Sequence, residues 1–284
     1  MIKTKKLGIL TIHGMGETES TFSCELENLL KIRLKKLSVD VEKEIHFESI
    51  YYQPVLQDNQ YNIWNKMQCE PSEKLRWLQL RKFFLFAFSD AVSLEHKPKE
   101  ENSVYKQTQK IIVESLRSTK NNLQNSQCPL IVIAQSLGCQ VISNYIWDSQ
   151  KEDKDKTIWD ENSSDYINPH DDEVDFLKLK TMKFLFTSGC NIPIFVAGFD
   201  SIQAFKKPNS EFQWKNYYDK DDCLGWPLQP LSEDYNKLVE DFEIDTGNVF
   251  SSWTPLSHGQ YWTDRDFVNP IVDAINEIMN YPAS

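Results

Sequence analysis

The chain has 284 residues, of which 40% are hydrophobic and 26% charged, so it can bury a core and global disorder is excluded. Its net charge of −11 would repel a phosphate backbone, which argues against nucleic acid as a partner. This length fits one large α/β domain or two smaller domains, and we interpret residues 1–284 as a single domain.

No targeting, metal-binding or membrane-spanning pattern is evident. The apolar run Leu7–Ile12 is too short for a secretory signal, and the apolar stretch 75–94 is interrupted by charged residues such as Arg81 and Asp90. The cysteines form no CxxC pair and the histidines no HExxH spacing. We therefore expect a soluble, cytoplasmic protein that uses no metal and no cofactor, whereas its oligomeric state stays open.

In chain order, the first element is an apolar strand, Leu7–Ile12, which ends at a glycine-containing turn. Leucines at helical spacing predict a helix over Phe22–Leu37, and Glu44–Tyr52 alternates as a second strand. The aromatic-rich stretch 61–94 is predicted to be helical and belongs to 53–100, which we interpret as a helical cap insertion. Whether this stretch is a lid over a pocket or part of the core stays open.

The middle of the chain predicts a helix, a buried strand and a second helix. Ser103–Leu123 is amphipathic, Pro129–Ala134 is continuously apolar as in a parallel sheet covered on both faces, and Leu137–Trp147 resumes helical periodicity. Residues 151–175 then carry ten acidic residues against three lysines. We interpret 151–178 as an acidic surface insertion, and not as a calcium site, because it contains no Asp-x-Asp-x-Asp-Gly loop.

The last third predicts strands at Met182–Thr187 and Gln213–Tyr218, a weaker strand at Thr246–Ser251, and a helix over Phe267–Met279. Strand and helix patterns thus alternate along most of the chain. This alternation predicts an α/β fold of three layers, with a mostly parallel sheet between helices on both faces.

One serine stands where a buried strand meets a helix. Ser136 has small residues two positions before and after it, Ala134 and Gly138, as the tight turn of a nucleophile elbow requires. The usual elbow has glycine in place of Ala134. Taken alone, a serine at this position is more often a helix N-cap.

The turn His13–Gly16 offers a second part of a catalytic site, because flexible glycines let a backbone N–H face a developing oxyanion. We predict an oxyanion hole formed by the N–H groups of Met15 and Leu137, the latter at the positive end of the elbow helix. His13 precedes the serine, the wrong order for this base, so we interpret it as orienting or structural.

His258 lies in a loop before the last helix and is the candidate general base, since a histidine pKa lies near working pH. Three aspartates after the strand ending at Tyr218 compete for the orienting acid, namely Asp219, Asp221 and Asp222. We favour Asp222 because it precedes Cys223-Leu224, where the chain turns back. Asp219 is the runner-up.

With these motifs the chain resembles the α/β-hydrolase superfamily, and more narrowly its lipase- and esterase-like bacterial members. The matching pieces span nearly the whole chain and are His13–Gly16, Ala134–Gly138, Asp219–Leu228 and Ser257–Trp262. The resemblance implies a sheet that lacks the first strands of the family. It also implies that Ser136, His258 and an aspartate cleave a small-molecule ester, thioester or lipid-like substrate through an acyl-enzyme.

Two other functions stay open. The fold could serve as a catalytically silent binding protein, because fold does not dictate function, or the acyl group could pass to an acceptor other than water. A complete serine, acid and histidine set argues against the first.

Overall fold

The computed structural model describes residues 5–68, 76–94, 103–151, 157–160, 173–246 and 260–280. Within these residues, six strands form one parallel sheet in the order β2-β1-β3-β4-β5-β6. The strands are β1 (Leu7–Ile12), β2 (Ile45–Ile50), β3 (Leu130–Gln135), β4 (Met182–Ser188), β5 (Gln213–Tyr218) and β6 (Val239–Glu243).

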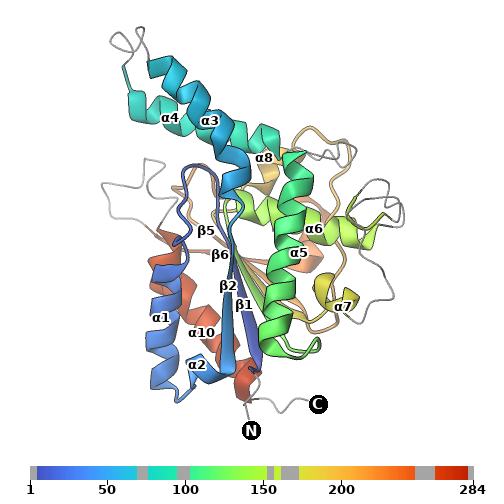
Figure 1. Ribbon diagram of the computed structural model, residues 1–284. Coiled ribbons are helices and arrows are strands. Elements are labelled where there is room, and N and C mark those ends of the chain that lie inside the picture. Colours follow the sequence, from blue (N-terminus) through green and yellow to red (C-terminus); the bar gives the residue numbers. More distant parts are fainter. Residues whose placement is uncertain are drawn as a thin grey trace.

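Helices cover both faces of the sheet (Figure 1). One face packs against α1 (Cys24–Lys36), α2 (Val41–Glu44) and α10 (Arg265–Asn280). The other packs against α5 (Val104–Leu123), α6 (Leu137–Gln150) and α7 (Val174–Leu177). Shorter helices, α8 (Ile192–Val196) and α9 (Glu233–Leu238), lie in the second half of the chain.

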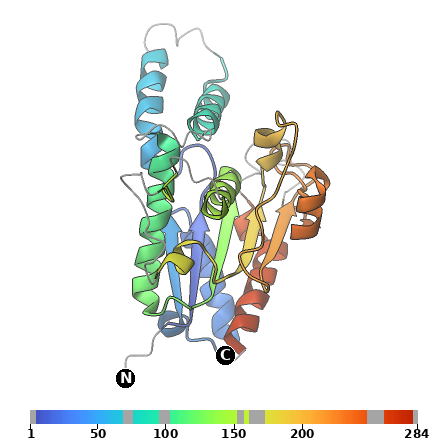
Figure 2. The ribbon, with the colours of Figure 1, turned by 90° about the vertical axis from the view of Figure 1, so that its right-hand side faces the viewer.

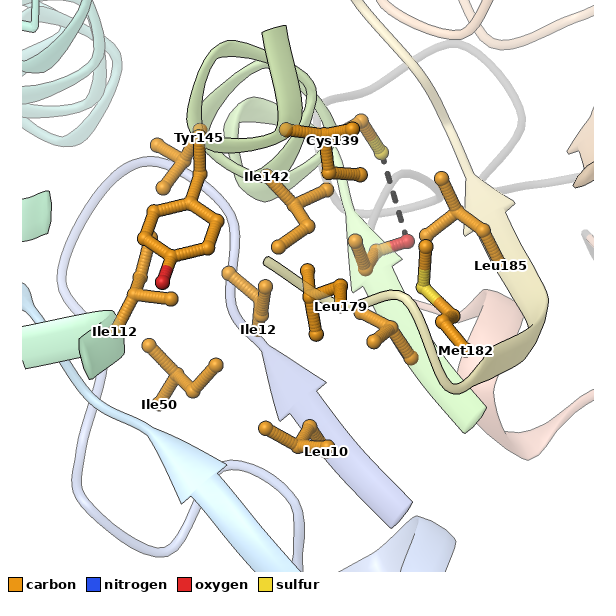
Figure 3. Packing of buried hydrophobic residues seen from close by; sticks show 14 of the residues in the cluster. Leu10, Ile12, Ile50, Ile112, Cys139, Ile142, Tyr145, Leu179, Met182 and Leu185 are labelled. Carbon is orange, nitrogen blue, oxygen red and sulfur yellow. Dashed lines mark hydrogen bonds between the residues drawn. The ribbon is translucent and has the colours of Figure 1, made fainter. Parts of the chain in front are cut away.

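The central strand shows why the sequence folds this way. In β3, Ile131 and Ile133 belong to the core on the α1 side, whereas Val132 and Ala134 belong to the core on the α5 side. Both faces of the strand are therefore buried, which explains its uninterrupted apolar sequence. Figure 3 shows the core on the α5 side, where side chains of β1, α5 and α6 meet, among them Leu10, Ile112 and Tyr145.

Two helices stand apart from these layers. Figures 1 and 2 show α3 (Gln53–Gln68) and α4 (Leu78–Ser93) side by side, beyond the ends of β1 and β2. The inner side of α4 buries Phe86 and Asp90, whereas Phe88 keeps 64% of its surface exposed. The stretch 61–94, predicted to be helical, thus contains the end of α3 and all of α4. One face of α4 is packed, and another exposes aromatic side chains.

The structure confirms the predicted three-layer α/β arrangement with a parallel sheet. The turn that carries the candidate oxyanion donor follows β1, whereas it follows the third strand in a complete α/β-hydrolase. That the chain is an α/β-hydrolase lacking the first strands of that family stays a prediction.

The predicted strand at Thr246–Ser251 stays a prediction, because residues 247–251 lie outside those described and only Thr246 falls within them. The sixth described strand is β6, which ends at Glu243, three residues before Thr246, and which the sequence pattern did not predict. Its sequence, Val-Glu-Asp-Phe-Glu, carries three acidic residues. An edge strand tolerates them because one side of it is open to water, so its pattern lacks the apolar run that identified β3.

The acidic insertion 151–178 is described only in part, and its character stays a prediction. Its carboxyl-terminal end forms α7, which buries Phe176 and Leu177 in the core. Among the described residues, no helix combines the length and apolarity that a bilayer crossing requires.

Candidate active site

Ser136 occupies a strained turn between β3 and α6. Its backbone angles, φ 51° and ψ −122°, fall where residues other than glycine rarely lie, which costs about 1–3 kcal/mol and is typical of a functional site. Its N–H donates to the Ser188 carbonyl oxygen at 3.0 Å, which fixes the turn against the end of β4. This strand, sharp turn and helix form the context of a nucleophile elbow.

The Ser136 hydroxyl has no structural task that the described residues reveal. The residue stands at the N-cap position of α6, yet its side chain makes no capping hydrogen bond. It is only 1% exposed, and its Oγ has no hydrogen-bond partner within the described part of the chain. The alternative that Ser136 is merely a helix cap is therefore not supported.

Two glycines bring the His13–Gly16 turn against this elbow. A Cβ atom on Gly14 would lie 2.8 Å from the Ser136 Cβ, and one on Gly138 would lie 2.5 Å from the His13 carbonyl oxygen. Either substitution would force backbone or buried atoms apart. The elbow and the turn, 120 residues apart in sequence, thus meet at the carboxyl ends of β1 and β3 because both contact positions lack a side chain.

The two predicted oxyanion donors adjoin these glycines. Leu137 is the first residue of α6, where an N–H has no acceptor inside the helix, and Met15 lies between the two glycines of the turn. Neither amide donates to a protein acceptor among the residues described. Both amides are therefore without an acceptor within the described residues, and their role as oxyanion donors stays a prediction.

His13 holds the turn in place. Its Nδ1 lies 2.8 Å from the Gly14 carbonyl oxygen, and its Nε2 accepts the Tyr52 N–H at 3.2 Å, so the proton is on Nδ1. Its ring stacks on Tyr52 at 4.0 Å between centroids. Burial lowers the pKa of His13 to about 4, so the ring is neutral near pH 7. These contacts agree with the structural role expected for His13.

The three candidate acids have different surroundings. Asp219 is buried, and its carboxylate accepts the Thr246 N–H and hydroxyl as well as the Asp221 N–H, each at 2.9 Å. Asp222 is also buried and accepts the Leu224 N–H at 3.0 Å and the Tyr261 hydroxyl at 2.9 Å. Asp221 is exposed.

His258 lies in 247–259, outside the described residues, so its position relative to Ser136 is not part of the structure. The residues on either side of that segment are anchored near the site. Thr246 is bonded to Asp219, and Tyr261, in the short 3₁₀ helix η4 (Tyr261–Thr263), is bonded to Asp222. Trp262 Nε1 donates to the Ser188 hydroxyl at 3.2 Å.

The sequence did not identify two residues that contact the candidate site. The buried Tyr261 bonds Asp222, and Asp90 on α4 accepts the Gly16 N–H. In the sequence, Asp90 stands out only as a charge within an apolar stretch. One signal was present, because Asp90 shares a helix face with Phe86 and Ala87, so a charged residue interrupts the buried stripe of α4.

No group of three or more potential metal ligands occurs among the described residues. No family model and no curated protein sequence matches this chain. One solved structure similar to it is a dienelactone hydrolase from Anabaena variabilis, with a TM-score of 0.42 and 9% identity over 98% of this chain and 88% of that one. At this TM-score the likeness adds no argument about function.

Proposed function

We propose that this protein is a cofactor-free serine hydrolase that cleaves a carboxylic ester or thioester. The observation that carries the proposal is the strained, buried Ser136, whose hydroxyl has no partner among the described residues and adjoins two unoccupied backbone N–H groups. A strained serine is expected to persist only where the strain serves a function.

The chemistry follows from these groups. The Ser136 Oγ attacks the substrate carbonyl carbon and passes its proton to His258, while the N–H groups of Met15 and Leu137 bind the tetrahedral oxyanion. His258 then returns the proton to the departing alcohol or thiol, leaving an acyl group on Ser136. A water molecule, deprotonated by His258, attacks this ester and releases the carboxylic acid and the free serine.

We assign Asp222 as the acid that orients His258. Asp219 is already bonded by three loop donors, so it is needed to shape the loop, and Asp221 is exposed. Asp222 bonds Tyr261, three residues after His258 in the sequence. Three residues of chain span at most about 11 Å, so the proposed pairing of His258 with Asp222 is compatible with the anchoring of Tyr261.

The remaining assignments are parts of the same proposal. The protein would act on a small-molecule ester or lipid-like substrate in the cytoplasm, as one domain, with 53–100 as a helical cap and 151–178 as a surface insertion. The exposed aromatic face of α4 fits a cap better than a core element, because aromatic side chains of a core helix are mostly buried.

The direct test is hydrolysis of short p-nitrophenyl esters by purified protein. Replacing Ser136 or His258 by alanine should each lower kcat by about 10⁶-fold, because the catalytic groups act as a unit. The matched control is Ser201→Ala, an exposed serine in a loop, which should leave kcat unchanged. Wild-type protein that hydrolyses none of these esters, or an active Ser136→Ala variant, would contradict the proposal.

A further inference from the structure

One carboxylate connects the outlying helical pair to the oxyanion turn. Asp90 of α4 accepts the Gly16 backbone N–H through Oδ2 at 2.8 Å. Its other oxygen, Oδ1, accepts the side-chain amide of Gln60, on α3. Asp90 is fully buried, so these bonds form away from bulk water, where a hydrogen bond to a charged group is worth more.

The Gly16 bond lies next to a predicted catalytic donor. Gly16 follows Met15 directly, and its φ of 90° is one that glycine adopts without strain. Gly16 is buried, but a Cβ on it would meet no atom within 4 Å, so no steric contact on that side fixes its conformation.

The turn is therefore held from two sides. Gly14 lies against Ser136, and His13 is bonded and stacked to Tyr52. Within the described residues, the acceptor of the Gly16 N–H is the Asp90 carboxylate. The Met15 N–H stands between these two anchors, so its direction depends on both.

We propose that Asp90 is a positioning residue for catalysis, which aims the Met15 N–H at the oxyanion by holding the Gly16 N–H. This inference rests on the proposed hydrolase function. It makes the rate of acyl transfer depend on how the α3–α4 pair is seated, although neither helix contributes a group to the chemistry.

The surroundings of Asp90 predict that the contact depends on pH. Burial raises the pKa of Asp90 to about 6, although the bonds from Gln60 and Gly16 oppose this. Tyr52, at the end of β2, stays neutral because burial and the nearby Asp90 raise its pKa. His13 is also neutral above pH 5, since its pKa is about 4.

The remaining charged groups near the contact pair with each other. Glu17, in the turn, accepts the Lys82 ammonium of α4 and the Tyr61 hydroxyl of α3, each at 2.6 Å. Titration of the Gly16 contact near pH 6 should therefore report Asp90. Protonation of Asp90 removes the charge that strengthens the bond and should loosen the turn.

The Gly16 amide can be observed directly by NMR. The chain has nine glycines and five methionines, and Met15-Gly16 is its sole Met-Gly pair. Carbonyl-¹³C methionine combined with ¹⁵N glycine therefore gives one correlation, which needs no further assignment. In the wild-type protein we expect this signal to shift with an apparent pKa of about 6, and its N–H to exchange slowly above that pH.

Variants link this signal to catalysis. Asp90→Ala should accelerate exchange of the Gly16 N–H and lower kcat by roughly 10- to 100-fold with little change in KM, because a displaced donor acts on the transition state. Asp90→Asn keeps an acceptor oxygen and should restore much of kcat while abolishing the titration. Ser93→Ala, near the end of the same helix, is the control and should change neither.

The outcomes separate the two proposals. A Gly16 signal that does not titrate in wild-type protein, or a Gly16 N–H released by Asp90→Ala with kcat unchanged, would overturn the role of Asp90. Wild-type protein without ester turnover but with a Gly16 signal that titrates near pH 6 would overturn the hydrolase proposal and leave only the Asp90 contact. If Asp90→Ala does not fold, the wild-type titration and Asp90→Asn still decide.

Discussion

The sheet and the α3–α4 pair are built in different ways. The central strands of the sheet are buried on both faces, and the ends of β1 and β3 meet through glycines with no room for a methyl group. In the helical pair, by contrast, α4 buries Phe86 at 1% exposure, whereas Trp77 and Phe88 keep 76% and 64% of their surface exposed.

This difference indicates that the two regions are held in place by different kinds of contact. The close packing at the carboxyl ends of β1 and β3 fixes the elbow and the turn relative to each other. The helical pair contacts the turn through polar groups, Asp90 with Gly16 and Lys82 with Glu17, and packs Leu56 into the core on the α5 side. Substitutions in the two regions should therefore affect different properties of the protein.

The largest effect on kcat is expected at the carboxyl ends of the strands, from loss of the proposed orienting acid. Asp222→Asn should lower kcat for a p-nitrophenyl ester by about 10⁴-fold with little change in KM, because the amide would favour the wrong histidine tautomer. Steady-state kinetics measure this.

The neighbouring aspartates provide the comparison. Asp221→Asn should be nearly normal because this side chain is exposed. Near-wild-type turnover of Asp222→Asn together with an inactive, folded Asp219→Asn protein would show that Asp219 is the acid. In that event the bond between Asp222 and Tyr261 would serve the fold alone.

Within the helical pair, two phenylalanines that are two residues apart in α4 and lie on different faces of the helix sharpen the contrast. Phe86→Ala should lower the free energy of unfolding by about 3–5 kcal/mol, because it removes a buried ring. Phe88→Ala, on the exposed face, should change it by less than about 0.5 kcal/mol. Chemical denaturation measures both, and equal losses would mean that the outer face of α4 is covered in solution.

A smaller loss is expected where the elbow touches the turn. Gly138→Ala places a methyl group 2.5 Å from the His13 carbonyl oxygen, which should cost about 1–3 kcal/mol of unfolding free energy and reduce ester turnover. Gly198→Ala is the matched control, because a Cβ there meets nothing within 4 Å. A Gly138→Ala protein as stable and as active as the control would show that the contact is looser than described.

No effect is expected from removing metal ions. Ester turnover should survive EDTA, since the proposed mechanism needs only side chains and backbone N–H groups. Activity that is lost in EDTA and restored by calcium or zinc would redirect attention to Asp171–Asp175, at the acidic insertion.

Sequence patterns predicted the sheet well because burial there follows the periodicity of strands and helices. The strand β5 has the predicted bounds, and β3 and α6 agree within a few residues, since their apolar positions face a core on a fixed period. The edge strand β6 could not be predicted from an apolar pattern, because several of its side chains are exposed to water.

In the candidate site, too, some features follow from a local sequence pattern and others do not. Ser136 could be predicted because a strand, a small-residue turn and a helix are contiguous in sequence, and the structure shows its strained backbone. Asp90 could not be assigned to Gly16, because 74 residues separate them and a hydrogen bond between distant segments leaves no periodic pattern. The same holds for Asp222 and Tyr261. The catalytic roles of Ser136, His258 and the three aspartates stay predictions.

The central claim is that Ser136 is an activated nucleophile, and labelling with a fluorophosphonate probe tests it most directly because the probe needs no knowledge of the substrate. Attack by an activated serine forms a stable phosphonyl ester that mass spectrometry of digested peptides can locate. We predict one adduct, on Ser136, that is absent from heat-unfolded wild-type protein and from the folded Ser136→Ala variant. A native wild-type protein that stays unlabelled, or an adduct that persists on another serine in Ser136→Ala, would contradict the account.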